Sequence, residues 1–254
     1  MGKASLKWLR GSALVAALSL SAAAANAAAP AHPDFTGVWT NAGRPALGGT
    51  TAVAPKASPL KAEAKAKIDE YQALVAPKGE TPGGMCLGTG MPGSMLGSGG
   101  YPMEIIQRPE QITVVYEAHS ETRRIYFGAR NAAPEDRVPG RNGYSSGRWE
   151  GNVLVVETDN LVEQVDQRTT SHSDQAKIVE RYYISPTEKG PNGERILIAD
   201  MTMTDPGFYT APVVQQKKWQ QVPNGRLLPY ECAEEVWHMR LEQLRKERDA
   251  KKAP

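Results

Sequence analysis

The chain has 254 residues, of which 30 are Lys or Arg and 28 are Asp or Glu. Three of the basic residues, Lys3, Lys7 and Arg10, lie in the first ten positions, and without them the counts are 27 against 28, a net charge near −1. Because nucleic-acid binding usually shows as a basic patch or stripe, this balance excludes nucleic acid as an expected partner. After residue 27 no stretch approaches 18 apolar residues, so no later membrane helix is predicted.

Residues 1–27 have the three parts of a cleavable secretory signal. A basic start is followed by an apolar run from Ala13 to about Ala25 and by the small-residue pattern Ala25-Asn26-Ala27. The run is shorter than the roughly 20 residues of a transmembrane helix, and no cysteine follows that could carry a lipid anchor. We expect cleavage near Ala27, no membrane anchor afterwards, and a periplasmic or secreted protein.

The next predicted segment, residues 28–103, contains a strand, a helix and a long loop. The strand covers 34–40, and the helix covers 59–76 with Ser58 as its N-cap and Pro59 in its first turn. Glycine, proline and methionine dominate residues 79–103, which predicts a loop. The mature chain is long enough for one domain, expected over 34–235.

Residues 104–232 are predicted to form a β-barrel core. Turns at 150–152, 191–193 and 223–225 contain Gly-Asn or Asn-Gly, which suit two-residue hairpins. Eight or nine strands joined in this way usually close on themselves, since closure removes exposed edges. The predicted fold is mainly β, an antiparallel up-and-down barrel or curled meander. Helix 59–76 and a helix at 233–250, within the charged segment 233–254, are expected outside it. The candidate strands are 104–108, 112–119, 122–127, 145–150, 153–158, 176–184, 194–204, 209–221 and 226–232.

Two cysteines, Cys86 and Cys232, are compatible with an oxidising compartment. Their pairing would close a loop of about 145 residues, which the chain-entropy model values at about 4–5 kcal/mol. Two free thiols are the alternative. The spacing excludes a Cys-x-x-Cys redox site.

Carboxylates on apolar strand faces are the main candidates for chemistry. Alternation places Glu180 on one face with Ile178 and Tyr182, and Glu117 on one face with His119. Burial raises the pKa of an interior carboxylate and a nearby arginine lowers it, a combination typical of acid/base sites. The alternative is that the arginines form structural salt bridges with these acids. Those arginines are Arg123, Arg124, Arg148 and Arg181.

Cofactor and metal motifs are missing from the sequence. His119 and His172 are the candidate histidines, yet no HxH or HxxxH spacing indicates a metal site. The nucleophile-elbow, P-loop and dinucleotide-binding patterns are absent as well. We therefore expect no metal and no nucleotide or flavin cofactor.

Several motifs resemble known proteins. Residues 34–39 (DFTGVW) resemble the Gly-x-Trp entry strand of lipocalin-like barrels. The motif GRWEGNVLVVET at 147–158 is similar to that of a largely uncharacterised family of exported bacterial proteins, and further similar stretches lie at 101–106, 123–126, 179–182, 205–206 and 230–232. The resemblance covers about 34–235. It implies a barrel-like domain and a Cys86–Cys232 disulfide, but no catalytic residue.

Two functions follow as hypotheses. The first is a cofactor-independent lyase or isomerase acting on a small apolar or aromatic molecule, such as a plant-derived phenolic dimer. Its base would be Glu117 or Glu180, its acid His119 or His172, its hydrogen-bond donor Tyr182, and its charge-stabilising cation Arg124 or Arg181. Tyr116, Tyr144 and Arg148 would contact the substrate.

The second hypothesis is a non-catalytic, lipocalin-like carrier of small hydrophobic ligands that uses the same pocket. In both cases the loop at 83–103 would act as a lid. Titratable groups facing a cavity favour catalysis, and a purely apolar lining favours a carrier. A structural or envelope-interaction protein is a third alternative.

Overall fold

A computed structural model describes residues 32–42, 60–97, 100–166, 170–230 and 235–252. The expected secretory signal, the expected N-cap Ser58 and the expected disulfide partner Cys232 lie outside these residues. Cys86 is not a free thiol, and its pairing with Cys232 stays a prediction. No helix in the described part of the chain has both the length and the apolar composition needed to cross a membrane.

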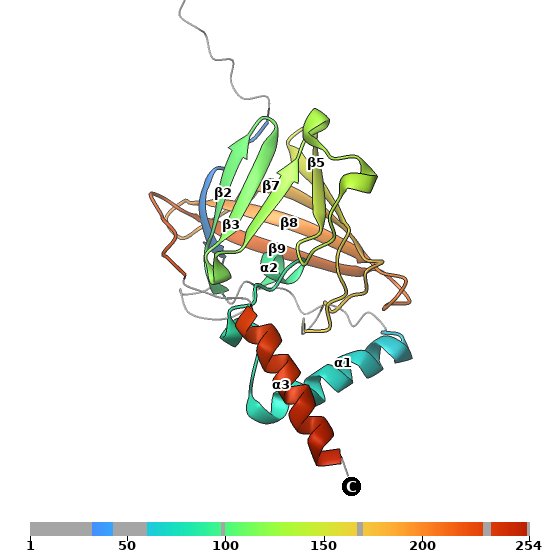
Figure 1. Cartoon of the computed structure of the whole chain (residues 1–254). Helices are drawn as coiled ribbons and strands as arrows, with labels where there is room; N and C mark the ends of the chain where they lie inside the picture. The colour runs from blue at the N-terminus through green and yellow to red at the C-terminus, as the bar shows by residue number, and fades with distance from the viewer. Residues whose placement is uncertain (1–31, 43–59, 98–99, 167–169, 231–234, 253–254) are drawn as a thin grey trace, which may run out of the picture. The chain divides into compact units, whose positions relative to one another are not determined.

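The described chain contains a closed barrel of nine strands, which confirms the predicted fold class (Figure 1). Each strand pairs with its neighbours in sequence, and the last returns to pair with the first. All neighbours are antiparallel except β4 and β5, which run parallel through the pair Ile125 and Ser145. The long connection between these two strands therefore interrupts the expected up-and-down order. The strands are β1 (Gly37–Asn41), β2 (Met103–Arg108), β3 (Gln111–Tyr116), β4 (Thr122–Tyr126), β5 (Tyr144–Glu150), β6 (Val153–Asp159), β7 (Lys177–Lys189), β8 (Arg195–Thr204) and β9 (Val213–Val222).

Two strand predictions were wrong in detail. The strand expected at 226–232 does not form in its described part, since residues 226–230 have no regular structure. Pairing of β1 with β9 already closes the barrel and leaves no edge for another strand. The strand expected from 209 begins only at Val213, directly after Pro212, which has no N–H for a β-ladder.

Two α-helices of the described residues lie outside the barrel, as expected. They are α1 (Ala62–Val75) and α3 (Glu235–Lys252), and they contact each other (Figure 1). Between them Val75, Leu87 and Trp237 form part of a small apolar cluster. Arg240 on α3 pairs with Glu80, with a 2.7 Å distance between Nη2 and Oε1.

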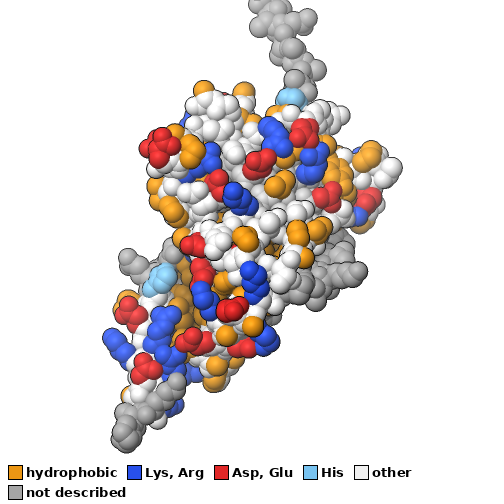
Figure 2. Space-filling model, turned by 90° about the vertical axis from the view of Figure 1, so that its right-hand side faces the viewer, with side chains coloured by type: hydrophobic (Ala, Val, Ile, Leu, Met, Phe, Trp, Pro, Cys, Tyr) orange, Lys and Arg blue, Asp and Glu red, His pale blue; other side chains and the backbone are white. Residues whose placement is uncertain are grey.

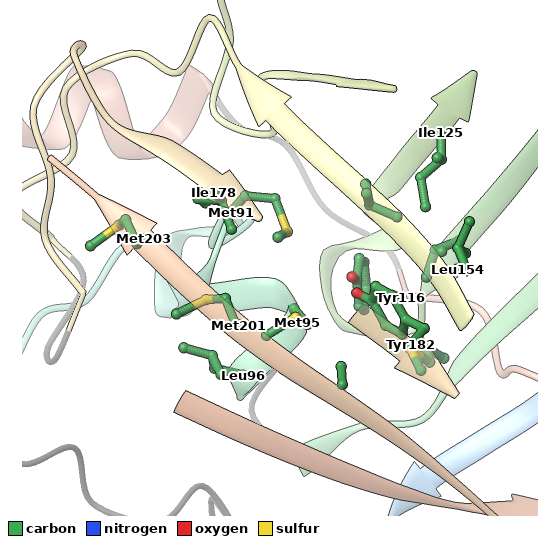
Figure 3. Close-up of a cluster of buried hydrophobic side chains, with 14 of the residues drawn as sticks. Met91, Met95, Leu96, Tyr116, Ile125, Leu154, Ile178, Tyr182, Met201 and Met203 are labelled. Carbon is green, nitrogen blue, oxygen red and sulfur yellow. The ribbon is translucent and has the colours of Figure 1, made fainter. Parts of the chain in front are cut away.

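The segment 83–103, which was expected to act as a lid, packs into the barrel in its described part. It contains the short helix α2 (Gly93–Leu96), and Met91, Met95 and Leu96 are buried in the main core. Figure 3 shows these side chains among Met201 and Met203 of β8 and other interior residues. The segment therefore closes part of the interior as a plug, because its apolar side chains are too numerous to remain exposed.

Candidate functional site

A buried ion pair lies inside the barrel. Arg123 on β4 and Glu180 on β7 are 1% and 0% exposed. The guanidinium donates from Nη1 to Glu180 Oε1 over 2.9 Å, and Nη2 pairs with the second carboxylate oxygen. Alternation explains the placement, because Arg123 shares its face with the core residue Ile125 and Glu180 shares its face with Ile178.

Hydroxyl groups surround this pair. Arg123 also donates from Nε to Ser145 Oγ over 3.1 Å and from Nη2 to Thr158 Oγ1 over 2.8 Å. Tyr182 donates its O–H to Glu180 Oε1 over 2.6 Å. Both carboxylate oxygens and all three guanidinium nitrogens thus have partners. We call this group, with the buried Tyr116 beside Arg123, the interior polar cluster: Tyr116, Arg123, Ser145, Thr158, Glu180 and Tyr182.

Tyr116, Arg123 and Tyr182 of the interior polar cluster all have raised pKa values. Burial raises the pKa of both Tyr116 and Tyr182 well above the ordinary value, so both phenols are neutral. Burial opposes the charge on Arg123, but the adjacent Glu180 carboxylate outweighs it and raises the pKa of the guanidinium. The cluster therefore offers a fixed charge pair and two neutral phenols. Glu180 would have to give up a present partner to act as a base.

Glu117 and His119 do not share an inward strand face, which corrects the expected strand at 112–119. Strand β3 ends at Tyr116, and the chain turns through a 3-10 turn (Ala118–Ser120) in which His119 has φ of 63°. The Glu117 carboxylate accepts the backbone N–H of Leu228 over 2.7 Å. Glu117 therefore fixes a neighbouring loop and is separate from the interior polar cluster.

His172 anchors the plug and is not placed beside Glu180. It is fully buried. Its Nε2 lies 3.0 Å from the carbonyl oxygen of Met91, and its Nδ1 lies 3.0 Å from the carbonyl oxygen of Ser173. Because Met91 belongs to the plug, this contact links the plug to the loop before β7. The structure thus brings Glu180 and Tyr182 together, and neither candidate histidine joins them.

Four other predicted site residues lie on the outer face. Arg124 is exposed, Arg181 pairs with Glu150 over 2.8 Å, and Arg148 pairs with the same acid over 3.2 Å. Tyr144 accepts a backbone N–H from Ala132 and stacks outside the barrel wall with Tyr126. Side chains of both charge signs are interspersed over the face shown in Figure 2. The cation beside Glu180 is therefore Arg123, which was expected only as a salt-bridge partner.

A second polar site is a surface cleft of about 500 Å³ that contains His119. Its Glu121 carboxylate accepts hydrogen bonds from Gly90 N, Ser94 Oγ and Asn142 Nδ2, over 2.9, 2.5 and 2.9 Å. Burial lowers the pKa of His119, and Glu121 partly offsets that shift. The cleft therefore holds a histidine inclined to be neutral near a fixed carboxylate. It is lined by Cys86, Leu87, Gly88, His119, Glu121, Gly140, Arg141, Asn142 and Gly143.

Within the described residues, no group of three His, Cys, Asp or Glu side chains is placed to hold a metal ion. No protein-family model, curated protein or solved structure matches the chain. The closed barrel is compatible with the fold of a lipocalin-like binding protein.

Proposed function

We propose that this protein binds a small, largely apolar or aromatic molecule inside its barrel, in the manner of a lipocalin-like carrier. The observation that carries the proposal is the composition of the interior, where a polar cluster is set among flexible thioethers and aromatic rings. Methionine is unbranched and adaptable, so a methionine-rich lining can rearrange around an apolar ligand. The buried methionines are Met91, Met95, Met103, Met201 and Met203.

The interior polar cluster supports recognition of a polar group on such a ligand. A buried ion pair is weak evidence for stability, since well-packed apolar residues of similar volume often serve as well or better. Small-molecule sites, in contrast, combine an apolar lining with a few fixed polar groups that orient the ligand. The phenols of Tyr116 and Tyr182 are suited to that role, because a phenolic oxygen can accept a hydrogen bond as well as donate one.

The proposal includes export. The pattern at residues 1–27 supports a mature protein that acts in the periplasm or outside the cell. A carrier in that compartment would meet small hydrophobic molecules before they enter the cytoplasm.

An acid/base enzyme is the second candidate, and the cleft around His119 favours it. A histidine inclined to be neutral can accept a proton, and Glu121 near it can stabilise the resulting cation. The chemistry would be of the lyase or isomerase type on an aromatic compound, such as a phenolic dimer. This candidate ranks second because Glu121 already accepts three hydrogen bonds and Glu180 is held by Arg123 and Tyr182.

The test uses the processed protein and N-phenyl-1-naphthylamine, a neutral aromatic probe that fluoresces when it enters an apolar site. We expect saturable one-to-one binding, and displacement by some members of a panel of aromatic monomers and dimers. The same mixtures are analysed by chromatography for product. Absence of saturable binding by the probe and by the whole panel would overturn the carrier proposal.

Matched variants separate the two candidate functions. Tyr182→Phe should weaken binding of panel members with a polar substituent, and Tyr183→Phe, one residue along β7 on the opposite face, should not. Product formation that is lost in both His119→Ala and Glu121→Gln, yet kept in Tyr182→Phe, would support the enzyme instead.

A further inference from the structure

Two polar side chains on β9 face the barrel interior. Gln215 and Lys217 alternate with Val213 and Trp219, which belong to the main core, so all four share the inward face. Gln215 is 5% exposed and Lys217 is 1% exposed. Both are therefore enclosed within the barrel wall rather than extended to solvent.

The strand register places these residues near the interior polar cluster. Across β8, Gln215 lies opposite Met201, which lies opposite Glu180 of β7. In the next inward row Lys217 lies opposite Ala199, which lies opposite Tyr182. Ala199, which lies between Lys217 and Tyr182 in this row, is itself fully buried.

Aromatic rings surround this part of the interior. Lys217 Nζ lies 6.0 Å from the ring centroid of Trp219, and the Trp219 ring stacks on Tyr182 with centroids 6.2 Å apart. Burial lowers the pKa of Lys217 to about 8. At neutral pH the amine is therefore mainly protonated, but it holds its charge in surroundings that disfavour it.

The amide of Gln215 has an unmet hydrogen-bonding requirement. Its Nε2 is buried and has no hydrogen-bond partner among the described residues. Buried polar groups in folded proteins are nearly always paired, so this donor can take an acceptor atom of a bound molecule, either water or a ligand. The oxygen atoms of Glu180 are already occupied by Arg123 and Tyr182.

We infer that Lys217 and Gln215 form a subsite for the carboxylate of an aromatic or apolar acid bound inside the barrel. This inference rests on the proposed function and narrows its ligand class. An ammonium and an amide N–H are both donors, and a carboxylate offers two acceptor oxygens and a charge opposite to that of the ammonium. The aromatic body of the acid would contact Trp219 and Met201.

The experiment compares acids with their amides as competitors of N-phenyl-1-naphthylamine at pH 7. The pairs are benzoate and benzamide, cinnamate and cinnamamide, and 2-naphthoate and 2-naphthamide, which differ mainly in charge. We expect at least one acid to displace the probe at a concentration about ten-fold lower than its amide does. Lys217→Met should abolish that preference, and Gln215→Leu should reduce it.

Lys218→Met is the matched control. Lys218 is the next residue on β9, faces outward and pairs with Glu188 over 2.7 Å, so its removal should leave the preference unchanged. Because loss of a buried cation can prevent folding, circular dichroism checks each variant, and Lys217→Gln provides a second neutral replacement of similar length.

The outcomes distinguish this inference from the proposed function. If the probe and the amides bind but no acid binds better, the carboxylate subsite is wrong and the carrier proposal stands. The same conclusion follows if the preference persists in folded Lys217→Met or Lys217→Gln protein. If neither the probe nor any competitor binds, both proposals are overturned.

Discussion

The inner and outer faces of β7 carry the same kind of ion pair in opposite surroundings. Glu180 faces inward and pairs with Arg123, and both side chains are almost completely buried. Arg181, the next residue, faces outward and pairs with Glu150, and these side chains are 45% and 42% exposed. Water and salt weaken the outer pair, but the inner pair has lost its hydration and depends on its protein partners. Neighbouring residues on one strand therefore form ion pairs of the same type that differ in hydration, and only the inner pair depends on its protein partners.

The largest expected effect comes from removing one member of the inner pair. Arg123→Met should lower the free energy of unfolding by about 3–5 kcal/mol, because it leaves the buried Glu180 carboxylate uncompensated. Arg124→Met, on the outer face of the same strand, should change it by less than about 0.5 kcal/mol. Urea denaturation monitored by tryptophan fluorescence measures both.

The double variant Arg123→Met/Glu180→Met sharpens this comparison. Replacing both charges with apolar groups removes the unmet carboxylate, so the double variant should be more stable than Arg123→Met alone. Equal losses in Arg123→Met and Arg124→Met would show that the inner pair is no more important than the exposed surface.

Lys217 should make stability depend on pH. Its folded pKa of about 8 lies below the ordinary value of 10.5, so between these values the unfolded chain binds more protons than the folded chain. The free energy of unfolding therefore rises with pH in this window, by at most about 1.4 kcal/mol per unit. We expect an increase of about 2 kcal/mol between roughly pH 7.5 and 9.5.

Other interior groups should not obscure this increase. Arg123 remains charged because the adjacent Glu180 raises its pKa, and the raised pKa values of Tyr116 and Tyr182 affect stability only above about pH 10. Lys217→Met should remove the increase, and Lys218→Met should retain it. A wild-type profile that is flat across the window would contradict the assigned burial of Lys217.

An intermediate effect is expected from a single hydroxyl group. Tyr182→Phe removes the donor to Glu180 Oε1 and leaves a buried carboxylate with one partner fewer, a loss of about 1–3 kcal/mol. Tyr183→Phe on the outer face should cost less, since water can replace its hydrogen bond. Equilibrium denaturation of the two variants gives the comparison, and equal losses would argue against the interior polar cluster.

Alternation in the sequence was enough to predict part of this arrangement. Ile178, Glu180 and Tyr182 were expected on one face and do share the inward face. The same rule could have identified Arg123, since it is two residues before the apolar Ile125, and Lys217, which is two before Trp219. Arg123 was expected only as a salt-bridge partner and Lys217 was not predicted, because alternation alone does not show which face of a strand is buried.

Other features depend on contacts between distant residues. Glu121 is fixed by Gly90 and Ser94, which are about 30 residues away, and no local pattern indicates that contact. The turn at His119 interrupts a run that otherwise has β character, through a positive φ that few residues adopt. Helix α2 contains the buried Met95 and Leu96, but its four residues are too few to show a helical apolar pattern in the sequence.

The smallest effect should come from the outer pair itself. Arg181→Ala removes the partner of Glu150, but Glu150 also contacts Arg148 and remains hydrated, so no charge is left without compensation. We expect no measurable shift in the denaturation midpoint at physiological ionic strength, and at most a slight decrease at low salt, where screening is weaker. A salt-independent loss comparable to that of Arg123→Met would mean that burial does not distinguish the two faces of β7.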